Sequence, residues 1–340
     1  MNNSKKQNNL VKARILTGDR PTGHLHLGHF VGTLQNRVKL QHSYDSFFII
    51  ADLHMLTTQP SLAKTSAIKN NARGMVLDYL SVGIDPKIST IYQQSKVLEV
   101  AYLALLFSML VTVPRCQRVP TLKEVMHDLK IKKPSLGLLN YPVLQSADIL
   151  MVKADLVPVG KDQESHLEIT REIAKTFNKT YKTVFPVPKA LIGDTGTLIG
   201  TDGQVKMSKS VGNTINLSDD FETVNQKVMA MYTDPSRIHP TDPGKVEGNP
   251  VFIYHRLFNS NKQEVLELED RYKHGKVGDV EVKRKLAVAI NNFLDPIRQQ
   301  RAKYQNKTDL IDQIIEAGSK KTSSIARDTL NQTLQAMKML

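Results

Sequence analysis

The chain has almost none of the features that stabilise small secreted proteins or anchor proteins in membranes. It holds a single cysteine, Cys116, which excludes an internal disulfide or a multi-cysteine zinc site and indicates a reducing, cytoplasmic location. Its longest apolar run, 97–113, is shorter than the ~20 residues of a membrane helix and contains Glu99, so we expect a buried or subunit-interface helix and no membrane association. The polar residues 1–12 predict a disordered lead rather than a signal peptide.

The composition is that of a globular protein with a strongly basic balance. Of the 340 residues, 40% are hydrophobic and 23% are charged, which excludes a disordered or fibrous chain and predicts about two domains. Lysine and arginine number 46 against 33 aspartates and glutamates, which gives a net charge of +13. This balance favours a polyanionic partner, either nucleic acid or a phosphorylated ligand, although compositional bias alone also makes some chains basic.

Strand and helix patterns alternate over the first 200 residues. Short apolar runs predict strands at 13–17, 46–51, 89–92 and 155–159. Helical spacing of apolar residues predicts helices at 27–40, 62–82, 97–113, 136–152 and 163–178. The alternation predicts an α/β domain over 13–200, with a Rossmann-like, doubly wound parallel sheet. Ligands of such sheets bind at the carboxyl ends of the strands, where Gly18, Asp52 and Gly160 are expected.

The alternation stops in the last third of the chain. Residues 184–203 are rich in proline, glycine and threonine and are interpreted as loops, followed by a linker over 201–217. Helical spacing then predicts helices at 219–232, 263–274, 281–305 and 308–340. We therefore expect an all-helical domain over 218–340 whose final helix packs back on the first domain. It carries basic clusters at 283–285 and 298–303 that suit a polyanion.

The first motif of chemical interest runs from Gly18 to His29, between the first strand and the first helix. Its glycines and Pro21 predict a tight turn that brings backbone N–H groups and a helix N-terminus toward a phosphate. His26 and His29, three residues apart, can project from one side and donate to phosphate oxygens, and Gly28 leaves room for a nucleotide. A solvated histidine cluster or a zinc pair is the alternative, and further zinc ligands are not evident.

The second motif is Lys206-Met207-Ser208-Lys209-Ser210, between Gly203 and Gly212. Two lysines three apart on a glycine-flanked loop can clamp a polyphosphate and stabilise a departing pyrophosphate. An ordinary solvated basic turn is the alternative for any isolated Lys-x-x-Lys. The full five-residue match, downstream of the histidine motif, favours the clamp.

Together these residues resemble the signature motifs of class I aminoacyl-tRNA synthetases. His26-Leu27-Gly28-His29 resembles the HIGH motif, and 206–210 matches the KMSKS motif. The segments 142–150, 157–163 and 231–235 resemble the bacterial-type tryptophanyl-tRNA synthetases, and the resemblance extends from about residue 15 to the C-terminus. The chain departs from this type at His26 and His29, where many bacterial members carry threonine and asparagine.

The resemblance implies a set of functional residues. His26, His29, Lys206 and Lys209 would serve catalysis. ATP, arriving with Mg²⁺ and without a metal site in the protein, would contact Arg20, Pro21, Thr22, Gly28, His29, Gly160, Lys161, Asp162, Leu198, Lys206, Met207, Ser208, Lys209 and Ser210. Asp148 would accept the indole N–H, with Gly18, His54, Val157, Val159 and Gln163 around the ring. Gln145 stands where many relatives carry methionine.

The implied activity is that of a cytoplasmic, homodimeric tryptophan–tRNA ligase. Such an enzyme forms tryptophanyl-adenylate from L-tryptophan and ATP and transfers tryptophan to tRNA(Trp), which the helical domain would bind at the anticodon. Three alternatives remain: a tyrosyl-tRNA synthetase, a small-molecule nucleotidyltransferase, and an inactive relative that only binds RNA. ATP–pyrophosphate exchange with tryptophan, with tyrosine and without amino acid separates them. Because the chain contains no tryptophan, the fluorescence of added tryptophan reports binding without background.

Overall fold

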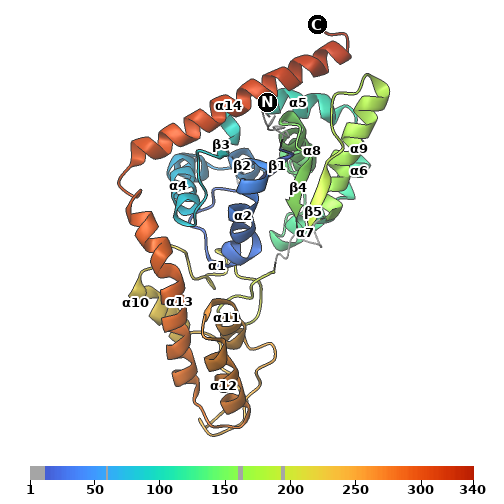
Figure 1. Cartoon of the computed structure of the whole chain (residues 1–340). Coiled ribbons are helices and arrows are strands. Elements are labelled where there is room, and N and C mark those ends of the chain that lie inside the picture. Colours follow the sequence, from blue (N-terminus) through green and yellow to red (C-terminus); the bar gives the residue numbers. More distant parts are fainter. Residues whose placement is uncertain (1–11, 59, 160–163, 193–195) are drawn as a thin grey trace, which may run out of the picture.

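A five-stranded parallel sheet forms the centre of the molecule (Figure 1). The computed structural model describes residues 12–58, 60–159, 164–192 and 196–340. The strands, in the spatial order β3-β2-β1-β4-β5, are β1 (Arg14–Asp19), β2 (Asp45–Ile50), β3 (Ser89–Gln93), β4 (Leu156–Val159) and β5 (Lys189–Ile192). The strand order reverses between β1 and β4, and ligands of open α/β sheets bind in the crevice beyond that point.

Helices cover both faces of the sheet and form a separate region beside it. The first group comprises α1 (Leu27–His29), the π-helical η1 (Phe30–Leu34), α2 (Gln35–Ser43), α3 (Asp52–Leu56), α4 (Leu62–Ser81), the 3₁₀-helical η2 (Gln94–Lys96), α5 (Glu99–Ser108), α6 (Val113–Gln117), α7 (Pro120–Asp128), α8 (Leu136–Met151) and α9 (Glu164–Thr180). The second comprises α10 (Phe221–Met229), α11 (Pro250–Phe258), α12 (Lys262–Lys273), α13 (Asp279–Ala302) and α14 (Thr308–Ala336). We call β1–β5 with α1–α9 the sheet domain and α10–α13 the helical region.

The sheet separates two apolar cores. Strand β2 is buried on both faces, as expected for a central parallel strand with the continuous apolar run Phe47–Ile50. Phe47 and Ile49 belong to a core under α5, α8 and α9. Phe48 and Ile50 belong to the other, which continues past α4 into the helical region and includes Phe252 and Leu286. The helical region is therefore joined to one face of the sheet by a continuous apolar core.

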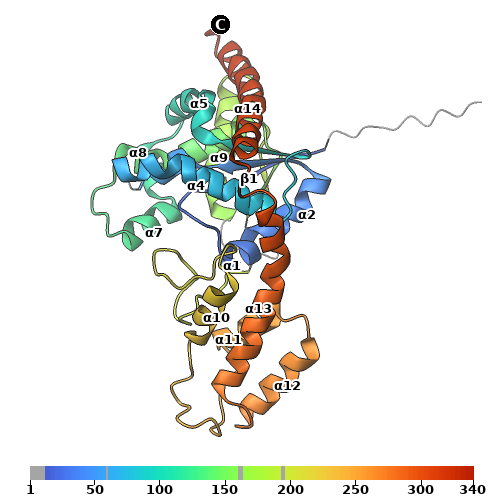
Figure 2. The ribbon, with the colours of Figure 1, turned by 90° about the vertical axis from the view of Figure 1, so that its left-hand side faces the viewer.

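The last helix returns to the sheet domain and covers the edge strand β3. Figure 2 shows α13 rising from the helical region toward α14, and Figure 1 shows α14 crossing the upper part of the molecule. The approach is close because Gly318 has no side chain: a Cβ there would lie 1.9 Å from the carbonyl oxygen of Ile91. Gln93 N donates to Ser319 Oγ at 3.2 Å, which satisfies a donor of the strand edge.

The structure confirms the predicted α/β fold with a doubly wound parallel sheet and a C-terminal helical part, and corrects several details. The segment 184–203 is not only loop, because it contains β5, whose four residues are too few to show a period. Helix α11 was not predicted, although Asn249 caps it and Pro250 begins it. The helix expected over 27–40 is interrupted by η1, and the one expected over 97–113 ends at Ser108.

Two further predictions concern the ends of the chain and membranes. Of the expected disordered lead, residues 1–11 lie outside the described residues, whereas Lys12 is described and its Nζ donates to His42 O at 2.7 Å. Among the helices of the described residues, none has the length and apolar character needed to cross a membrane.

Candidate active site

The turn after β1 begins on a rigid base. A Cβ on Gly18 would lie 1.9 Å from Ile49 O of the neighbouring strand, so only glycine fits there. The next residue, Asp19, is paired with Arg37, and Tyr79 OH donates to its Oδ2 at 2.9 Å. Burial alone would raise the pKa of Asp19, but the Arg37 guanidinium outweighs it and holds the pKa below its usual range. Asp19 is therefore a fixed carboxylate that supports the turn.

His26 and His29 lie side by side, as their spacing predicts, with ring centroids 3.8 Å apart. His26 N donates to His29 Nδ1 at 3.3 Å. Burial, followed by repulsion from the neighbouring imidazole and lysines, lowers the pKa of His26 to about 3. Burial likewise lowers the pKa of His29 to about 4. Both rings are therefore neutral at pH 7, and His26 Nδ1 is buried with no hydrogen-bond partner among the described residues.

The KMSKS segment lies directly against this turn, so the structure brings the two motifs together. Met207 Sδ accepts from Gly28 N at 3.2 Å. Lys209 Nζ donates to Gly23 O at 2.9 Å and to Thr22 Oγ1 at 3.3 Å. Burial lowers the pKa of Lys209. Within the described part of the chain, the hydrogen-bond partners of Lys209 Nζ are a carbonyl and a hydroxyl, which an arriving anion can replace.

The loop after the KMSKS segment also holds the turn. Leu27 N donates to Ile215 O at 2.9 Å, and Leu217 N donates to Leu25 O at 2.9 Å. Inside the loop, Met207 N donates to the carbonyl of the buried Leu198 at 2.9 Å. The backbone around 198–217 therefore builds one wall of the site.

A residue that the sequence did not indicate anchors the turn to the helical region. Asp78 of α4 is fully buried, and its Oδ2 accepts from Leu25 N at 2.8 Å. Its other oxygen is paired with Arg301 at the end of α13. Burial raises the pKa of Asp78, and the Arg301 guanidinium opposes that effect. No local pattern marks Asp78. Arg301 belongs to the basic cluster predicted over 298–303, but the structure pairs it with a carboxylate 223 residues away, a contact that only the fold creates.

The predicted acceptor of the indole N–H, Asp148, lies in a second cluster. It is 2% exposed on α8, and His54 Nε2 of α3 lies 2.9 Å from its Oδ2. Gln94 Nε2 of η2 donates to both carboxylate oxygens, at 3.0 and 2.8 Å. Burial raises the pKa of Asp148, while the hydrogen bonds from His54 and Gln94 lower it. Sequence reasoning missed Gln94, whose only signal is a polar residue directly after a buried strand.

The remaining predicted residues are placed as follows. Val157 is buried and Val159 half-buried on β4, which pairs with β1. Among the predicted ATP contacts, Pro21 is buried, Ser208 is half-buried, and Arg20, Thr22, Lys206 and Ser210 are exposed. Gly160, Lys161, Asp162 and Gln163 lie outside the described residues.

Part of the basic surface predicted for the C-terminal third is wrong. Lys283 is buried, and its Nζ donates to Met231 O at 2.6 Å and to Thr233 Oγ1 at 2.7 Å. Lys285 is paired with Glu264 at 2.6 Å. Lys283 faces inward, and Lys285 is half-exposed but paired across to α12, which a run of three basic residues in the sequence did not reveal.

The described residues contain no group of three or more histidine, cysteine, aspartate or glutamate side chains that could hold a metal ion. The acidic side chains at the site already have partners, Arg37 for Asp19 and Arg301 for Asp78. The donor set therefore suits a phosphorylated ligand that brings its own counterion.

Comparison with known proteins agrees with this geometry. Residues 8–295 match the family described as tRNA synthetases class I (W and Y). The chain is 54% identical over 324 residues to the tryptophan–tRNA ligase of Treponema pallidum, covering 95% of this chain and 96% of that one. It is 55% identical over 314 residues to that of Borreliella burgdorferi, covering 92% and 90%.

A solved structure gives the same result. Tryptophanyl-tRNA synthetase from Campylobacter jejuni, complexed with ADP and tryptophan, superposes with a TM-score of 0.84 at 31% identity, covering 96% of this chain and 99% of that one. The full-length match and the two joined motifs lead to the same assignment. The chain belongs to the tryptophan–tRNA ligase family of the class I tRNA synthetases.

Proposed function

We infer that this chain is a tryptophan–tRNA ligase, which activates L-tryptophan with ATP and transfers it to tRNA(Trp). The main support is that the two motifs are in contact in a chain of this family. Gly28 N donates to Met207 Sδ, and Lys209 Nζ donates to Gly23 O. ATP–pyrophosphate exchange tests it. Exchange should require tryptophan; exchange with tyrosine, or without any amino acid, would contradict it.

In the proposed first step, a carboxylate oxygen of tryptophan attacks the α-phosphorus of ATP. A new O–P bond forms, the bond to the β-phosphate oxygen breaks, and pyrophosphate leaves with its electron pair. The nucleophile is already ionised, so no side chain has to act as a general base. Catalysis then consists of positioning and electrostatic stabilisation of the transition state.

We assign roles to the motif residues on this basis. Neutral His26 and His29 donate hydrogen bonds to phosphate oxygens, and the unpaired His26 Nδ1 supports a ligand at this place. Lys209 exchanges its contacts with Gly23 and Thr22 for the phosphates, and Lys206 assists it as pyrophosphate departs. The remaining proposed ATP contacts are Arg20, Pro21, Gly28, Gly160, Lys161, Asp162, Leu198, Met207, Ser208 and Ser210.

We propose that Mg²⁺ enters with ATP as part of the substrate. This fits the site because its carboxylates Asp19 and Asp78 are paired with arginines. The ion would bridge phosphate oxygens and neutralise charge there, while the lysines of 206–210 hold the remaining charge.

The amino-acid end is proposed to bind the indole ring beside Asp148. Indole nitrogen only donates, so an apolar pocket needs one acceptor, and a buried carboxylate is a strong one. His54 contacts Asp148 directly, and we propose that Gly18, Val157, Val159 and Gln163 complete the pocket. Gln145 lies one helical turn before Asp148 on α8, where it can pack against the ring.

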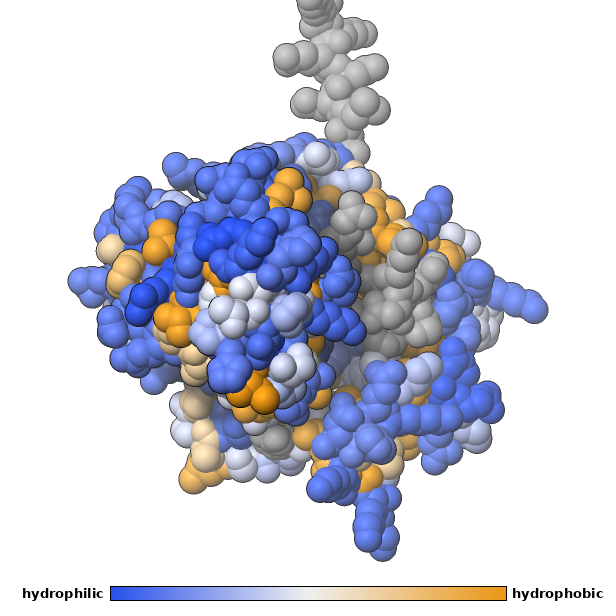
Figure 3. Space-filling view, turned by 90° about the horizontal axis from the view of Figure 1, so that it is seen from below, coloured by the Kyte–Doolittle hydropathy of each residue, from blue (hydrophilic) through white to orange (hydrophobic). Residues whose placement is uncertain are grey.

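For the second step we propose that the helical part, 218–340, binds the anticodon of tRNA(Trp). Seen from below, this end of the molecule is mostly hydrophilic with scattered apolar residues, as a nucleic-acid surface would be (Figure 3). On α13, Arg284 is exposed, in contrast to the buried Lys283. Arg284→Glu should weaken tRNA charging and leave ATP–pyrophosphate exchange intact. Equal effects on both reactions would remove Arg284 from the tRNA surface.

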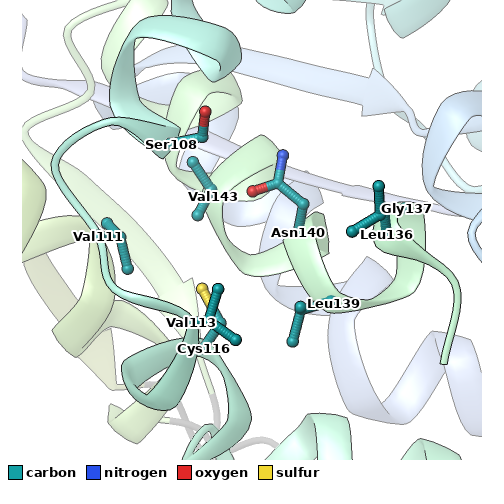
Figure 4. A pocket seen from close by; sticks show the side chains of 9 residues that line it. All are labelled: Ser108, Val111, Val113, Cys116, Leu136, Gly137, Leu139, Asn140 and Val143. Atoms are coloured by element: carbon teal, nitrogen blue, oxygen red, sulfur yellow. The ribbon is translucent and has the colours of Figure 1, made fainter. Parts of the chain in front are cut away.

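We further propose a cytoplasmic homodimer formed through the outer face of α5. Its large apolar side chains are exposed, namely Leu98, Tyr102, Leu105 and Met109, next to Val113 and Leu136. Val113 and Leu136 also line a cavity of about 380 Å³ between α5, α6 and α8, together with residues that include Cys116 and Val143 (Figure 4). Leu105→Glu should shift the mass measured by light scattering from dimer to monomer; a wild-type monomer would refute the proposal.

A further inference from the structure

Gln94 has an unusually complete set of partners for a residue that no motif marks. Its side chain is fully buried in η2, directly after β3. Its amide nitrogen donates to Asp148 Oδ1 and Oδ2 at 3.0 and 2.8 Å. Its amide oxygen accepts from Leu53 N at 3.1 Å and from His54 N at 3.3 Å. Both ends of the amide are thus occupied at the start of α3 and at the carboxylate.

These partners fix which way the amide points. A backbone N–H can only donate, so the oxygen of Gln94 must face Leu53 and His54, and its NH₂ must face Asp148. Because an amide NH₂ group accepts no hydrogen bond, Asp148 must act as the hydrogen-bond acceptor toward Gln94. The amide therefore leaves Asp148 as an acceptor for any further group that approaches it.

The other groups near Asp148 act less directly. His54 of α3 contacts one oxygen at 2.9 Å. Asp52, also on α3, repels the Asp148 charge, but Ser95 and Gln93 hold its carboxylate by hydrogen bonds. Tyr92 of β3 feels the Asp148 charge, and its buried hydroxyl has no partner among the described residues. Among the described residues, Gln94 donates to both oxygens of Asp148, whereas His54 reaches one.

We propose that Gln94 is a positioning residue for substrate selection: its NH₂ group holds Asp148 as a pure acceptor, so that the site takes an aromatic amino acid whose ring presents an N–H. This inference rests on the proposed function and deepens it. It assigns part of the selectivity to a residue that acts only through Asp148.

The test compares Gln94→Met with Gln93→Met in the full-length protein. Gln93 is the matched control because its amide also donates to a buried carboxylate, that of Asp52, at 2.7 Å. Each variant is assayed by ATP–pyrophosphate exchange with tryptophan and with 3-benzothienylalanine, in which sulfur replaces the N–H. Gln94→Met should raise KM for tryptophan at least about tenfold, as expected for lost hydrogen bonds to a charged group. The ratio of the specificity constants for tryptophan and for 3-benzothienylalanine should fall by a similar factor. KM for ATP should not change.

A second variant, Gln94→Glu, tests the direction in which KM for tryptophan changes with pH. Two adjacent carboxylates share a proton more readily at low pH, and the introduced carboxyl group, once protonated, again donates to Asp148. KM for tryptophan should therefore fall between about pH 8 and about pH 6 in this variant. The wild type has no carboxyl group at position 94, so its KM for tryptophan should not fall over the same interval.

The possible results separate the two proposals. A wild type that exchanges with tryptophan upholds the function, and only the variants then decide the role of Gln94. Equal losses for tryptophan and its sulfur analogue, with an unaltered pH profile, would overturn that role. If Gln94→Met fails to fold by circular dichroism, the sign of the pH response in Gln94→Glu decides, and a response like the wild type's would overturn it.

Discussion

The two ends of the site are built in different ways. At the proposed amino-acid end, the described side chains that hold Asp148, namely His54 and Gln94, both come from the sheet domain. At the nucleotide end, the turn is held by the 198–217 loop and, through Asp78, by Arg301 of the helical region. In the proposed function, tryptophan recognition is thus preformed inside one domain, whereas the phosphate site is assembled where the sheet domain meets the helical region.

The charges follow the same division. Asp148 is a single carboxylate surrounded by donors, ready before any ligand arrives. At the proposed nucleotide end the imidazoles are neutral, and the described hydrogen-bond partners of Lys209 Nζ are a hydroxyl and a carbonyl, so we propose that a phosphate supplies the anion for this cation. Interactions that strengthen only as charge develops accelerate the reaction, whereas those already formed select the substrate. The comparison assigns selectivity to one end and rate to the other.

The largest expected effect is at Lys209. Lys209→Ala should lower the single-turnover rate of adenylate formation about 10²–10³-fold, because one preorganised charge at the departing group is worth ~3–4 kcal/mol. ATP affinity should change far less. Rapid-quench measurement at saturating ATP, with equilibrium ATP binding beside it, checks this. A large loss of ATP affinity with an intact rate would make the loop a ground-state clamp.

The next effect is at the other end of the site. Asp148→Asn removes the charge from the acceptor and lowers the specificity constant for tryptophan about 10- to 150-fold, the range for ~1.5–3 kcal/mol. ATP binding should stay within the wild-type range because the nucleotide end shares none of these contacts. Steady-state exchange at varied tryptophan measures it, and an unchanged specificity constant would exclude Asp148 from the pocket.

A smaller effect is expected from the junction itself. Arg301→Met leaves Asp78 without its cation, loosens the turn at Leu25, and should slow adenylate formation about tenfold, less than the ~10²-fold that a 1 Å misplacement can cost. The matched control is Arg73→Met. Arg73 lies on α4, like Asp78, and its ion pair with Asp312 of α14 contacts neither motif. Equal losses in the two variants would mean a general weakening of the domain contact.

The smallest effect concerns pH. The pKa values of His26 and His29 lie at about 3 and about 4, below the ordinary 6.5, so protonation disfavours the native turn. Their contribution to stability is present above pH 6.5 and is lost as pH falls toward those values. Each slope should stay below about 1.4 kcal/mol per pH unit because each ring takes up at most one proton.

The check replaces both histidines by the residues that many bacterial relatives carry. The drop in the thermal midpoint between about pH 7.5 and about pH 5.5 should be smaller in the His26→Thr, His29→Asn variant than in the wild type. An equal drop would show that other groups control acid stability.

The sequence predicted the functional residues that lie in contiguous motifs. It missed those whose role depends on contacts between segments distant in the sequence. His26, His29 and Lys209 stand in contiguous motifs tied to a strand–turn–helix, so pattern alone placed them at one site. Asp78, Gln94 and Arg301 matter only because distant segments meet in the folded chain, and no periodicity encodes that. Lys283 is an opposite example. A lysine in a basic cluster is expected at the surface, but the fold buries this one against carbonyl oxygens.

The most direct test of the division between the two ends is equilibrium binding of tryptophan without ATP, followed by its own fluorescence. The protein contains no tryptophan, and excitation at the long-wavelength edge of tryptophan absorption avoids its ten tyrosines, so the signal comes from the ligand. Wild type, Lys209→Ala and Arg301→Met should bind tryptophan with dissociation constants within about twofold, because residues that share no partners act independently to within ~0.5 kcal/mol. A tenfold or weaker affinity in either variant would show that the amino-acid site depends on the junction, and would contradict the account.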